Sequence, residues 1–386
     1  MPARRPLKIV HIGPDSQFLQ FAANVFESVA PGANEYLVVG SSDDETLRHP
    51  IARGAVHVVS PSRRGVVALL ARRRECDLIV AHSMTPHAAA AFARARPQTV
   101  TVWSGFGFDY YGNHELLGPQ TRELAAGLAQ TEAATRVPLR RAFGSAWYLF
   151  ARRLTRRAAA RADYFSAPVP TDEPVFRSQF PQFHGQYSQL NYASLEETFA
   201  TVGADREKGG GVLVGNSATP SNNHLEAFEL LAGRDLGGRR IIVPLNYGDP
   251  TYRDAIAERG TQLFGAAFLP LIERMPLDEY NELVAGCDIV IMNQRRQQGL
   301  GNIGTALYAG ATIFLDDANP VYEFLRQAGA SVRSTSELRS AGPLPPPLSD
   351  DELAANHRFL ESFWGAERVR ENVAALIGKL DAVTTA

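Results

Sequence analysis

The sequence predicts an α/β protein built from two Rossmann-like domains, whose parallel sheets face each other across a crevice. Short apolar runs rich in Val and Ile alternate with helical stretches through the whole chain. These runs lack the polar and apolar alternation of half-exposed strands, which is typical of strands buried on both faces of a parallel sheet. The same rhythm occurs in each half of the 386 residues, which is enough chain for two domains of ordinary size.

The expected strands and helices follow one another closely. In the first half, strands are predicted over 7–13, 34–40, 55–60, 76–83 and 98–105, and helices over 16–29, 62–74 and 86–95. In the second half, strands are predicted over 211–216, 239–246, 287–294 and 311–317, with helices between them. The short spacing from strand to helix indicates parallel connections.

The domain boundaries are predicted from changes in composition. Charged and glycine residues replace the apolar periodicity near 200–210, and a proline-rich break follows at 341–352. We therefore expect a first domain over 1–205, a second over 206–345 and a helical segment over 346–386. Ser349 or Asp350 is expected to cap a final helix that runs to about residue 380 and packs back across the domain interface.

Charge and cysteine content narrow the class of protein. The formal net charge is −2, which gives no reason to expect nucleic-acid binding. Cys76 and Cys287 lie in different halves, which argues against a disulfide scaffold and favours a reducing compartment. The first residues lack the apolar core of a signal peptide, and no run approaches about 18 apolar residues. The sequence therefore predicts a soluble, cytoplasmic protein.

The most informative stretch is NQRRQQGLGNIGTALYAG, residues 293–310, which follows a predicted strand. Gly299, Gly301 and Gly304 have the spacing of a dinucleotide-binding fingerprint, and Asp316 ends the next strand. However, the first glycine comes seven residues after the strand, whereas the fingerprint needs it in the tight turn itself. A polar loop leading to a helix N-terminus fits a diphosphate better, because backbone N–H groups and arginine supply donors. A solvated loop with capping glycines is the alternative.

Two further corners carry polar residues where predicted strands end. After the strand at 211–216 comes NSATPSNN, whose small polar residues and proline are explained equally well by ordinary helix capping. In VPLNYGDPTY, residues 243–252, Tyr247 is expected either to stack on a base or to be a buried aromatic residue. Because the carboxyl ends of parallel strands meet at one edge, we expect the three corners to converge on one site for a nucleotide diphosphate.

The expected ligand contacts are the polar and glycine residues of these corners. For the donor and its diphosphate they are Asn216, Ser217, Asn222, Asn223, Arg295, Gln297, Gln298, Gly299, Leu300, Gly301 and Asn302, and for the nucleoside Asn246 and Tyr247. No Asp-x-Asp motif occurs in the chain, so we expect no metal site and no cofactor. Helix N-termini and Arg295 or Arg296 would instead stabilise the charge of the leaving group.

Three segments of the second half carry a resemblance to a known family: GNSATPSNNHLEAF, VPLNYGD and MPLDEYNELVAGCDIVIMNQRRQQGLGNIGTALY. They resemble the TDP-N-acetylfucosamine:lipid II N-acetylfucosaminyltransferase family. The similarity is strongest over 211–325, and HIGPDSQF, DYYG and ADYFSAPVPTDE extend it into the first half. The resemblance implies a GT-B fold, with a dTDP-4-acetamido-4,6-dideoxygalactose donor in the second domain and a lipid-linked acceptor in the first. VWSGFGFDYYG departs from the Trp-Gly-rich pattern of the family, which leaves the acceptor's identity open.

An inverting transferase needs a base that takes the proton of the acceptor hydroxyl, and we expect it in the first domain. Asp15 is our candidate, because it follows the strand at 7–13 in a Gly-Pro turn. Capping of the next helix, alone or shared with Ser16, is the alternative role. His11, His82 and Asp109 are rival bases, and the acceptor-side candidates are His82, Trp103 and Asp109.

Residues 133–162 form a basic segment with eight arginines, no acidic residue and interleaved aromatic residues. A basic amphipathic helix of this kind suits the surface of an anionic membrane. The candidate membrane contacts are Arg140, Arg141, Trp147, Arg152, Arg153 and Arg156. An ordinary surface helix, a contact with the acceptor pyrophosphate and nucleic-acid binding are the alternatives, and no recognised nucleic-acid motif accompanies the segment.

Together with the resemblance, these features predict a peripheral glycosyltransferase on the cytoplasmic face of the bacterial inner membrane. It would move a 4-acetamido-4,6-dideoxyhexose of the Fuc4NAc type from dTDP to a polyprenyl-diphosphate-linked saccharide, without a metal. The alternatives are a GT-B transferase with another dTDP- or UDP-sugar or a non-lipid acceptor, an NAD-dependent oxidoreductase, and a catalytically silent nucleotide-binding protein.

Overall fold

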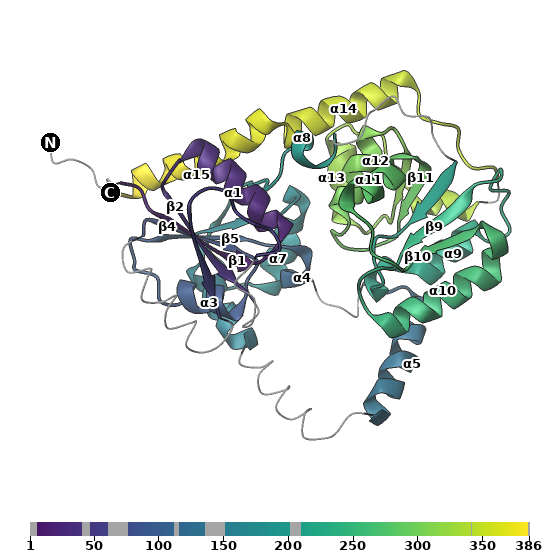
Figure 1. Ribbon diagram of the computed structural model, residues 1–386, viewed down its shortest axis with the longest axis horizontal. Coiled ribbons are helices and arrows are strands. Elements are labelled where there is room, and N and C mark those ends of the chain that lie inside the picture. Colours follow the sequence, from purple (N-terminus) through teal and green to yellow (C-terminus); the bar gives the residue numbers. More distant parts are fainter. Residues whose placement is uncertain are drawn as a thin grey trace. The chain divides into compact units, whose positions relative to one another are not determined.

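The computed structural model describes residues 6–40, 47–60, 76–111, 116–135, 151–200, 210–340 and 342–384. The chain divides into two compact units, and each is described by itself (Figure 1). Unit 1 combines residues 1–111, 137–194 and 366–386, and unit 2 combines residues 112–136 and 195–365. The contacts therefore group the chain differently from the linear division into 1–205, 206–345 and 346–386.

Unit 1 is built on a seven-stranded parallel sheet of order β3-β2-β1-β4-β5-β6-β7. Its strands are β1 (Ile9–Pro14), β2 (Asn34–Val39), β3 (Ala55–Val59), β4 (Leu78–His82), β5 (Val100–Ser104), β6 (Tyr164–Ser166) and β7 (Gln186–Tyr187). The five predicted strands of the first half are present, and two short strands, β6 and β7, extend the sheet. The inner strand β4 is buried over its whole length, as expected for a sheet covered on both faces.

Helices surround this sheet. They are α1 (Gln17–Val29), α3 (Pro86–Phe92), α4 (Gly107–Tyr110), the short η2 (Pro170–Asp172), α7 (Glu173–Gln179) and α15 (Ala366–Thr384). Residues 151–161 are also helical. The predicted helix over 62–74 lies outside the described residues.

Unit 2 contains a six-stranded parallel sheet of order β10-β9-β8-β11-β12-β13. Its strands are β8 (Gly211–Val214), β9 (Arg240–Pro244), β10 (Phe268–Leu271), β11 (Cys287–Met292), β12 (Thr312–Leu315) and β13 (Arg333–Ser334). The four predicted strands form its centre. The sequence analysis missed β10, which contains Pro270 and lies at the edge, where a residue without an N–H group is tolerated.

The helices of unit 2 alternate with these strands. They are α5 (Pro119–Thr135), α8 (Leu195–Thr198), η3 (Pro220–Asn222), α9 (His224–Leu231), α10 (Pro250–Phe264), η4 (Gly265–Ala267), α11 (Leu277–Ala285), α12 (Leu300–Tyr308), α13 (Pro320–Gln327), η5 (Thr335–Arg339) and α14 (Asp350–Trp364). Two parallel-sheet units of this kind confirm the predicted α/β class.

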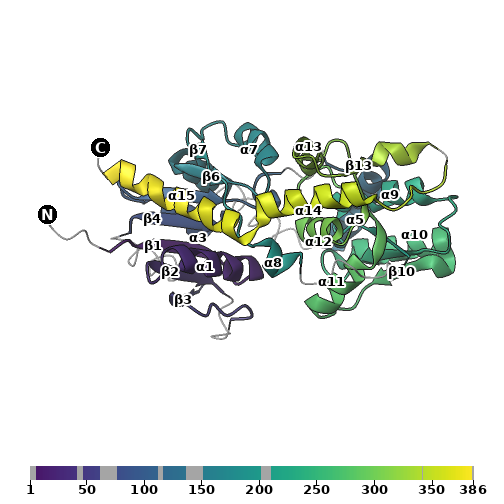
Figure 2. The same ribbon diagram turned by 90° about the horizontal axis from the view of Figure 1, so that it is seen from above.

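The C-terminal segment consists of two helices instead of the single one expected. Ser349 caps α14 in a capping box with Glu352. The helix ends at Gly365, where an added Cβ would lie 2.4 Å from the Glu361 carbonyl oxygen. The following α15 buries Val369, Val373, Leu376 and Leu380 in the same cluster as Ile9 and Leu78 of the first sheet. Figures 1 and 2 both show α15 alongside α1, so the chain's last helix returns to unit 1.

Helix α5 is a part of the first half that belongs to unit 2. It contacts α9 and α10 (Figure 1), and Leu124 and Leu128 pack against the core of the second sheet. Thr121 donates from its backbone N–H and its hydroxyl to the Glu226 carboxylate, at 3.0 and 2.5 Å. These partly buried polar contacts and the packing of Leu124 and Leu128 explain why the described residues 116–135 belong to unit 2.

None of the helices in the described parts of the chain combines the length and hydropathy needed to span a bilayer.

Candidate functional site

The strand order of unit 2 places three polar loops side by side. Strand β8 pairs with β9 on one side and with β11 on the other, and all three are parallel. The loops that follow them, 215–223, 245–249 and 293–299, therefore leave the same edge of the sheet. The chain order reverses between β8 and β11, and such a switch point is where ligands bind in open α/β sheets.

Hydrogen bonds join the three loops. Gln298 Nε2 donates to Asn216 Oδ1 at 2.9 Å, and Asn216 Nδ2 donates to the Tyr247 hydroxyl at 2.9 Å. Gln298 Oε1 in turn accepts from Ser221 Oγ at 2.7 Å and from Arg296 Nε at 2.8 Å. Ser217 Oγ also accepts from Gln298 Nε2, at 3.3 Å. Gln298 thus joins the loops after β8 and β11, and Asn216 extends the connection to the loop after β9.

Asn222 and Asn223 are buried, and their amide groups are used within the protein. Asn222 Oδ1 accepts from the Asn216 N–H at 3.0 Å and from Gln294 Nε2 at 2.7 Å, while its Nδ2 donates within the loop. Asn223 has a left-handed backbone, with φ of 51°, and its amide bonds the backbone of residues 116, 118 and 293. Their exposed fractions are 0% and 1%, so we assign both to positioning the loop, in place of the donor contacts expected from the sequence.

The three glycines around the start of α12 have different roles. Gly299 precedes the helix with φ of 69°, a conformation that favours glycine. An added Cβ at Gly304 would lie 2.5 Å from the Phe199 ring, so this glycine allows close packing. At Gly301, which is exposed, an added Cβ would meet no atom within 4 Å. Of these three glycines, Gly301 is therefore the one whose missing side chain is not required by the protein's own packing or backbone conformation. It lies in the first turn of the helix.

The arginines and the remaining polar residues surround this helix start. Arg295 Nε lies 3.4 Å from Asp316 Oδ2. In a dinucleotide-binding site, an acidic residue at the position of Asp316 would hydrogen-bond the ribose, but here it forms an ion pair with Arg295. Gln297 is 9% exposed and Leu300 is half-buried. Asn302 Nδ2 donates to the Tyr280 hydroxyl at 2.7 Å. Tyr280 joins α11 to this site, and the sequence analysis missed it because no motif places it there.

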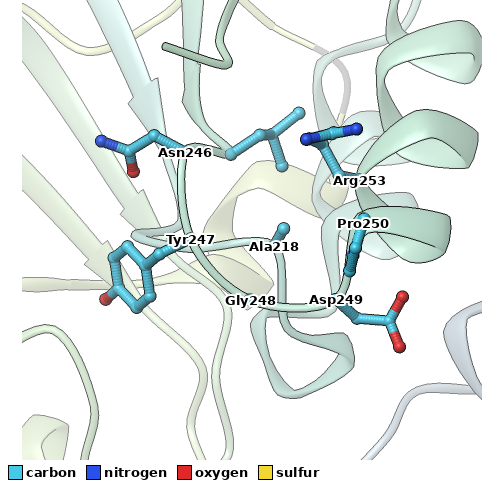
Figure 3. A pocket seen from close by; sticks show the side chains of 8 residues that line it. Ala218, Asn246, Tyr247, Gly248, Asp249, Pro250 and Arg253 are labelled. Carbon is cyan, nitrogen blue, oxygen red and sulfur yellow. The ribbon is translucent and has the colours of Figure 1, made fainter. Parts of the chain in front are cut away.

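Asn246 and Tyr247 lie beside a hollow of about 200 Å³, which is open to solvent and lined by residues 245–250 together with Ala218 and Arg253. Figure 3 shows the Asn246 and Tyr247 side chains projecting to one side of the loop, with Asp249 and Arg253 on the other. The Tyr247 side chain is 53% exposed although its hydroxyl is bonded to Asn216. Asp249 caps α10 by accepting two backbone N–H groups.

In unit 1, Asp15 is an anchor for a neighbouring loop. Its two carboxylate oxygens accept the N–H groups of Arg48 and His49, at 2.8 and 3.1 Å. The alternative role as a helix cap is filled by Ser16, whose hydroxyl accepts from the Leu19 N–H. Because a carboxylate offers about four acceptor sites, Asp15 keeps acceptor capacity on its partly exposed side.

His82, Trp103 and Asp109 are part of the scaffold under the same sheet edge. Nε2 of His82 lies 3.0 Å from Nδ1 of the buried His11, and burial holds the pKa of His82 well below its usual range and lowers that of His11 to about 4. Asp109 accepts from the Trp103 indole N–H at 3.3 Å, the Ser83 hydroxyl at 2.8 Å and two backbone N–H groups. Burial raises the pKa of this carboxyl group. We therefore assign all three acceptor-side candidates to positioning.

The basic segment is described only in part. Arg152, Arg153 and Arg156 are exposed on the helix over 151–161, while Ala158 and Ala159 on the same helix are buried in the core. Arg140, Arg141 and Trp147 lie outside the described residues. Within the described ranges, no three His, Cys, Asp or Glu side chains gather closely enough to hold a metal ion.

Comparisons with known proteins agree with this architecture. Residues 153–339 match the family described as 4-alpha-L-fucosyltransferase glycosyl transferase group 56, which confirms the family resemblance found in the sequence. The Burkholderia vietnamiensis α,α-trehalose-phosphate synthase (UDP-forming) superposes with a TM-score of 0.61 at 11% identity, covering 97% of this chain and 100% of that chain. The Anabaena protein HepE in complex with UDP and glucose superposes with a TM-score of 0.53 at 14% identity, covering 98% and 97%.

The two glycines of α12 give a matched test of these roles. Gly304→Ala is expected to lower the free energy of unfolding by about 1–3 kcal/mol, because its Cβ would overpack against Phe199. Gly301→Ala is expected to leave stability unchanged or raise it by up to about 1 kcal/mol, because alanine favours a helix. Urea denaturation of both variants measures the difference. Equal stability of the two would contradict the packing role of Gly304.

Proposed function

We propose that this chain, a GT-B glycosyltransferase whose residues 153–339 match glycosyl transferase group 56, transfers a 4-acetamido-4,6-dideoxyhexose from dTDP to a polyprenyl-diphosphate-linked saccharide. The observation that carries this proposal is the linked set of loops at the carboxyl edge of the second sheet. These loops follow three neighbouring strands, and they bring hydrogen-bonding side chains to the exposed start of α12.

The diphosphate is proposed to lie at the N-terminus of α12. The first N–H groups of a helix have no partner within the helix, and the helix dipole favours negative charge there. Gly301 leaves room for close approach, and Arg296 lies beside Gln298 in the same loop. These groups would stabilise the charge that develops on the leaving dTDP without a metal ion.

The nucleoside is proposed to lie against Tyr247. Its ring is exposed while its hydroxyl is held by Asn216, so the ring is already fixed in orientation before a ligand arrives. A fixed aromatic face loses little conformational entropy when a base stacks on it. Asn246, which neighbours it on the same side of the loop, is proposed to hydrogen-bond the nucleoside (Figure 3).

The base is proposed to be Asp15. In an inverting reaction the acceptor oxygen bonds to the anomeric carbon, its proton passes to the base, and dTDP leaves with the electron pair of the broken bond. Asp15 lies at the carboxyl edge of the first sheet, directly after β1, and is partly exposed. The acceptor is lipid-linked in this proposal, so the protein would work at an anionic membrane surface, with Arg152, Arg153 and Arg156 as contacts.

A thermal-shift titration tests the donor class. We expect dTDP to raise the melting temperature, with a stabilisation of about 2.7 kcal/mol at a hundredfold excess over Kd, and EDTA to change nothing. UDP, GDP and NADH serve as competitors. Gln298→Ala is expected to weaken the dTDP shift because it disconnects the loops, whereas Gln327→Ala, an exposed glutamine on α13, serves as the control. A shift with NADH alone would contradict the transferase proposal.

Replacing Asp15 by asparagine tests the proposed base. The amide of the Asp15→Asn variant would keep one oxygen to anchor the 48–49 loop but could not take a proton, so we expect transfer to fall by roughly 10²–10⁴-fold. The dTDP-induced thermal shift should stay the same, because the donor site belongs to the other unit. Asp15 would be only an anchor if Asp15→Asn transferred sugar at the wild-type rate.

Liposome co-sedimentation tests the membrane surface. Changing Arg152, Arg153 and Arg156 together to Ala is expected to weaken binding to vesicles rich in anionic lipid by about 1 kcal/mol per arginine. A variant with Arg326, Arg358 and Arg370 changed to Ala removes the same charge from other exposed positions and is the control. Binding that does not depend on anionic lipid would refute the proposal.

A further inference from the structure

Exposed aromatic residues are few in the described parts of the chain, and they follow strands at the carboxyl edges of the two sheets. Among the large exposed apolar side chains described, the aromatic ones are Phe18, Phe108 and Tyr247, with exposed fractions of 48%, 66% and 53%. Tyr247 lies in the donor loops. Phe18 and Phe108 lie in unit 1, and such exposure adds little to folding stability because little apolar area is removed from water.

Phe18 and Phe108 belong to a cluster of four rings, which we name the aromatic platform: Phe18, Phe106, Phe108 and Tyr192. Phe18, Phe106 and Tyr192 contact one another, with ring centroids 5.2–5.3 Å apart. Phe108 stacks on Phe106 with its centroid 5.6 Å away and the ring planes within 4°. The rings therefore brace one another, while Phe18 and Phe108 keep open faces toward solvent.

The aromatic platform is assembled from three separate loops at one edge of the first sheet. Phe18 lies at the start of α1, directly after β1. Phe106 and Phe108 follow β5, and Tyr192 follows β7. All these strands are parallel, so the loops leave the same carboxyl edge. This is the edge that binds ligands in open α/β sheets, and Asp15 lies on it three residues before Phe18.

The charge of these loops decides between possible ligands. Residues 13–18, 105–111 and 188–194 contain no Lys, Arg or His, and of their two carboxylates Asp109 is occupied by internal hydrogen bonds, which leaves Asp15 as the partly exposed one. These three loops therefore offer an anionic ligand no cation of their own, and the Asp15 carboxylate disfavours such a ligand; Arg48, in the loop that Asp15 anchors, is a nearby cation. A sugar ring suits them, because its C–H groups complement the negative face of an aromatic ring and its hydroxyl groups can donate to the Asp15 carboxylate.

We propose that the aromatic platform is the acceptor subsite, where the terminal sugar ring of the acceptor stacks on Phe108 and Phe18. The proposal rests on the proposed transferase function, and it adds the residues that would hold the reacting sugar near Asp15. The prenyl chain and the membrane surface are the other occupants to be tested, since both would need only apolar area.

Substitutions at Phe108 separate these occupants, because the residue is exposed and its variants are expected to fold. Phe108→Ala is expected to raise the KM for the lipid-linked acceptor at least tenfold, with the KM for the donor and the dTDP thermal shift unchanged. Phe108→Tyr, which keeps an aromatic face, should retain the wild-type KM, and Phe108→Leu, which keeps apolar area without a ring, should behave like Phe108→Ala. Leu277→Ala, at an exposed leucine of unit 2, is the control.

Two outcomes, one in transfer kinetics and one in liposome binding, would overturn the proposal. A wild-type acceptor KM in Phe108→Leu would assign the platform to the prenyl chain. Loss of liposome binding in Phe108→Ala, with an unchanged KM for a water-soluble acceptor, would assign it to the membrane.

A binding measurement that needs no sugar transfer tests the acceptor subsite separately from the proposed transferase function. Saturation-transfer NMR with water-soluble acetamidohexose disaccharides is expected to show contact with the wild type, and the signal should be lost in a Phe18→Ala, Phe108→Ala double variant. Absence of contact with the wild type would refute the subsite even if dTDP binds. Contact without any dTDP shift would keep the subsite and refute the donor assignment.

Discussion

The amide of Asn222 is the contact on which the arrangement of the donor site depends. The side chain is fully buried, and its oxygen and nitrogen together bond the Asn216 N–H, Gln294 and the turn over 217–219. Such a buried group is costly to leave unsatisfied, so the loop after β8 has one low-energy arrangement. That arrangement fixes Asn216, which in turn positions Gln298 and Tyr247 from the two neighbouring strands.

Asn223 extends this constraint to a distant part of the chain. Its amide accepts from the Gly118 N–H and donates to the carbonyl oxygens of Leu116 and Asn293. The left-handed backbone at this position, uncommon for a residue with a side chain, is stabilised by these three bonds. Residues 116–118 therefore connect the first half of the sequence directly to the loop after β11, so their position and the geometry of the donor loops depend on one another.

At the carboxyl edge of the first sheet, several of the described polar side chains are used inside the protein. Asp109 bonds Trp103, Ser83 and backbone N–H groups, and His11 bonds His82 and Asn34, so these polar atoms are used within the protein. Among the described residues of this edge, Asp15 is partly exposed, and Phe18 and Phe108 of the aromatic platform are exposed. In unit 2, by contrast, a polar network holds the exposed start of α12, so the two edges suit different chemistry.

The sequence alone determined the α/β class, the central strands and the three polar corners, because apolar periodicity and strand-end composition are local properties of the chain. It also narrowed the cap of the C-terminal helix to Ser349 or Asp350 and marked residues 293 to 302 as a site candidate. Only the tertiary structure decided which of these residues are buried, since Ser221 and Asn222 are adjacent polar residues of one turn, yet Asn222 is fully buried and Ser221 is not. The return of α15 to the first sheet, the place of α5 in unit 2 and the meeting of Phe18, Phe106 and Tyr192 likewise depend on contacts between residues distant in sequence, which no local pattern encodes.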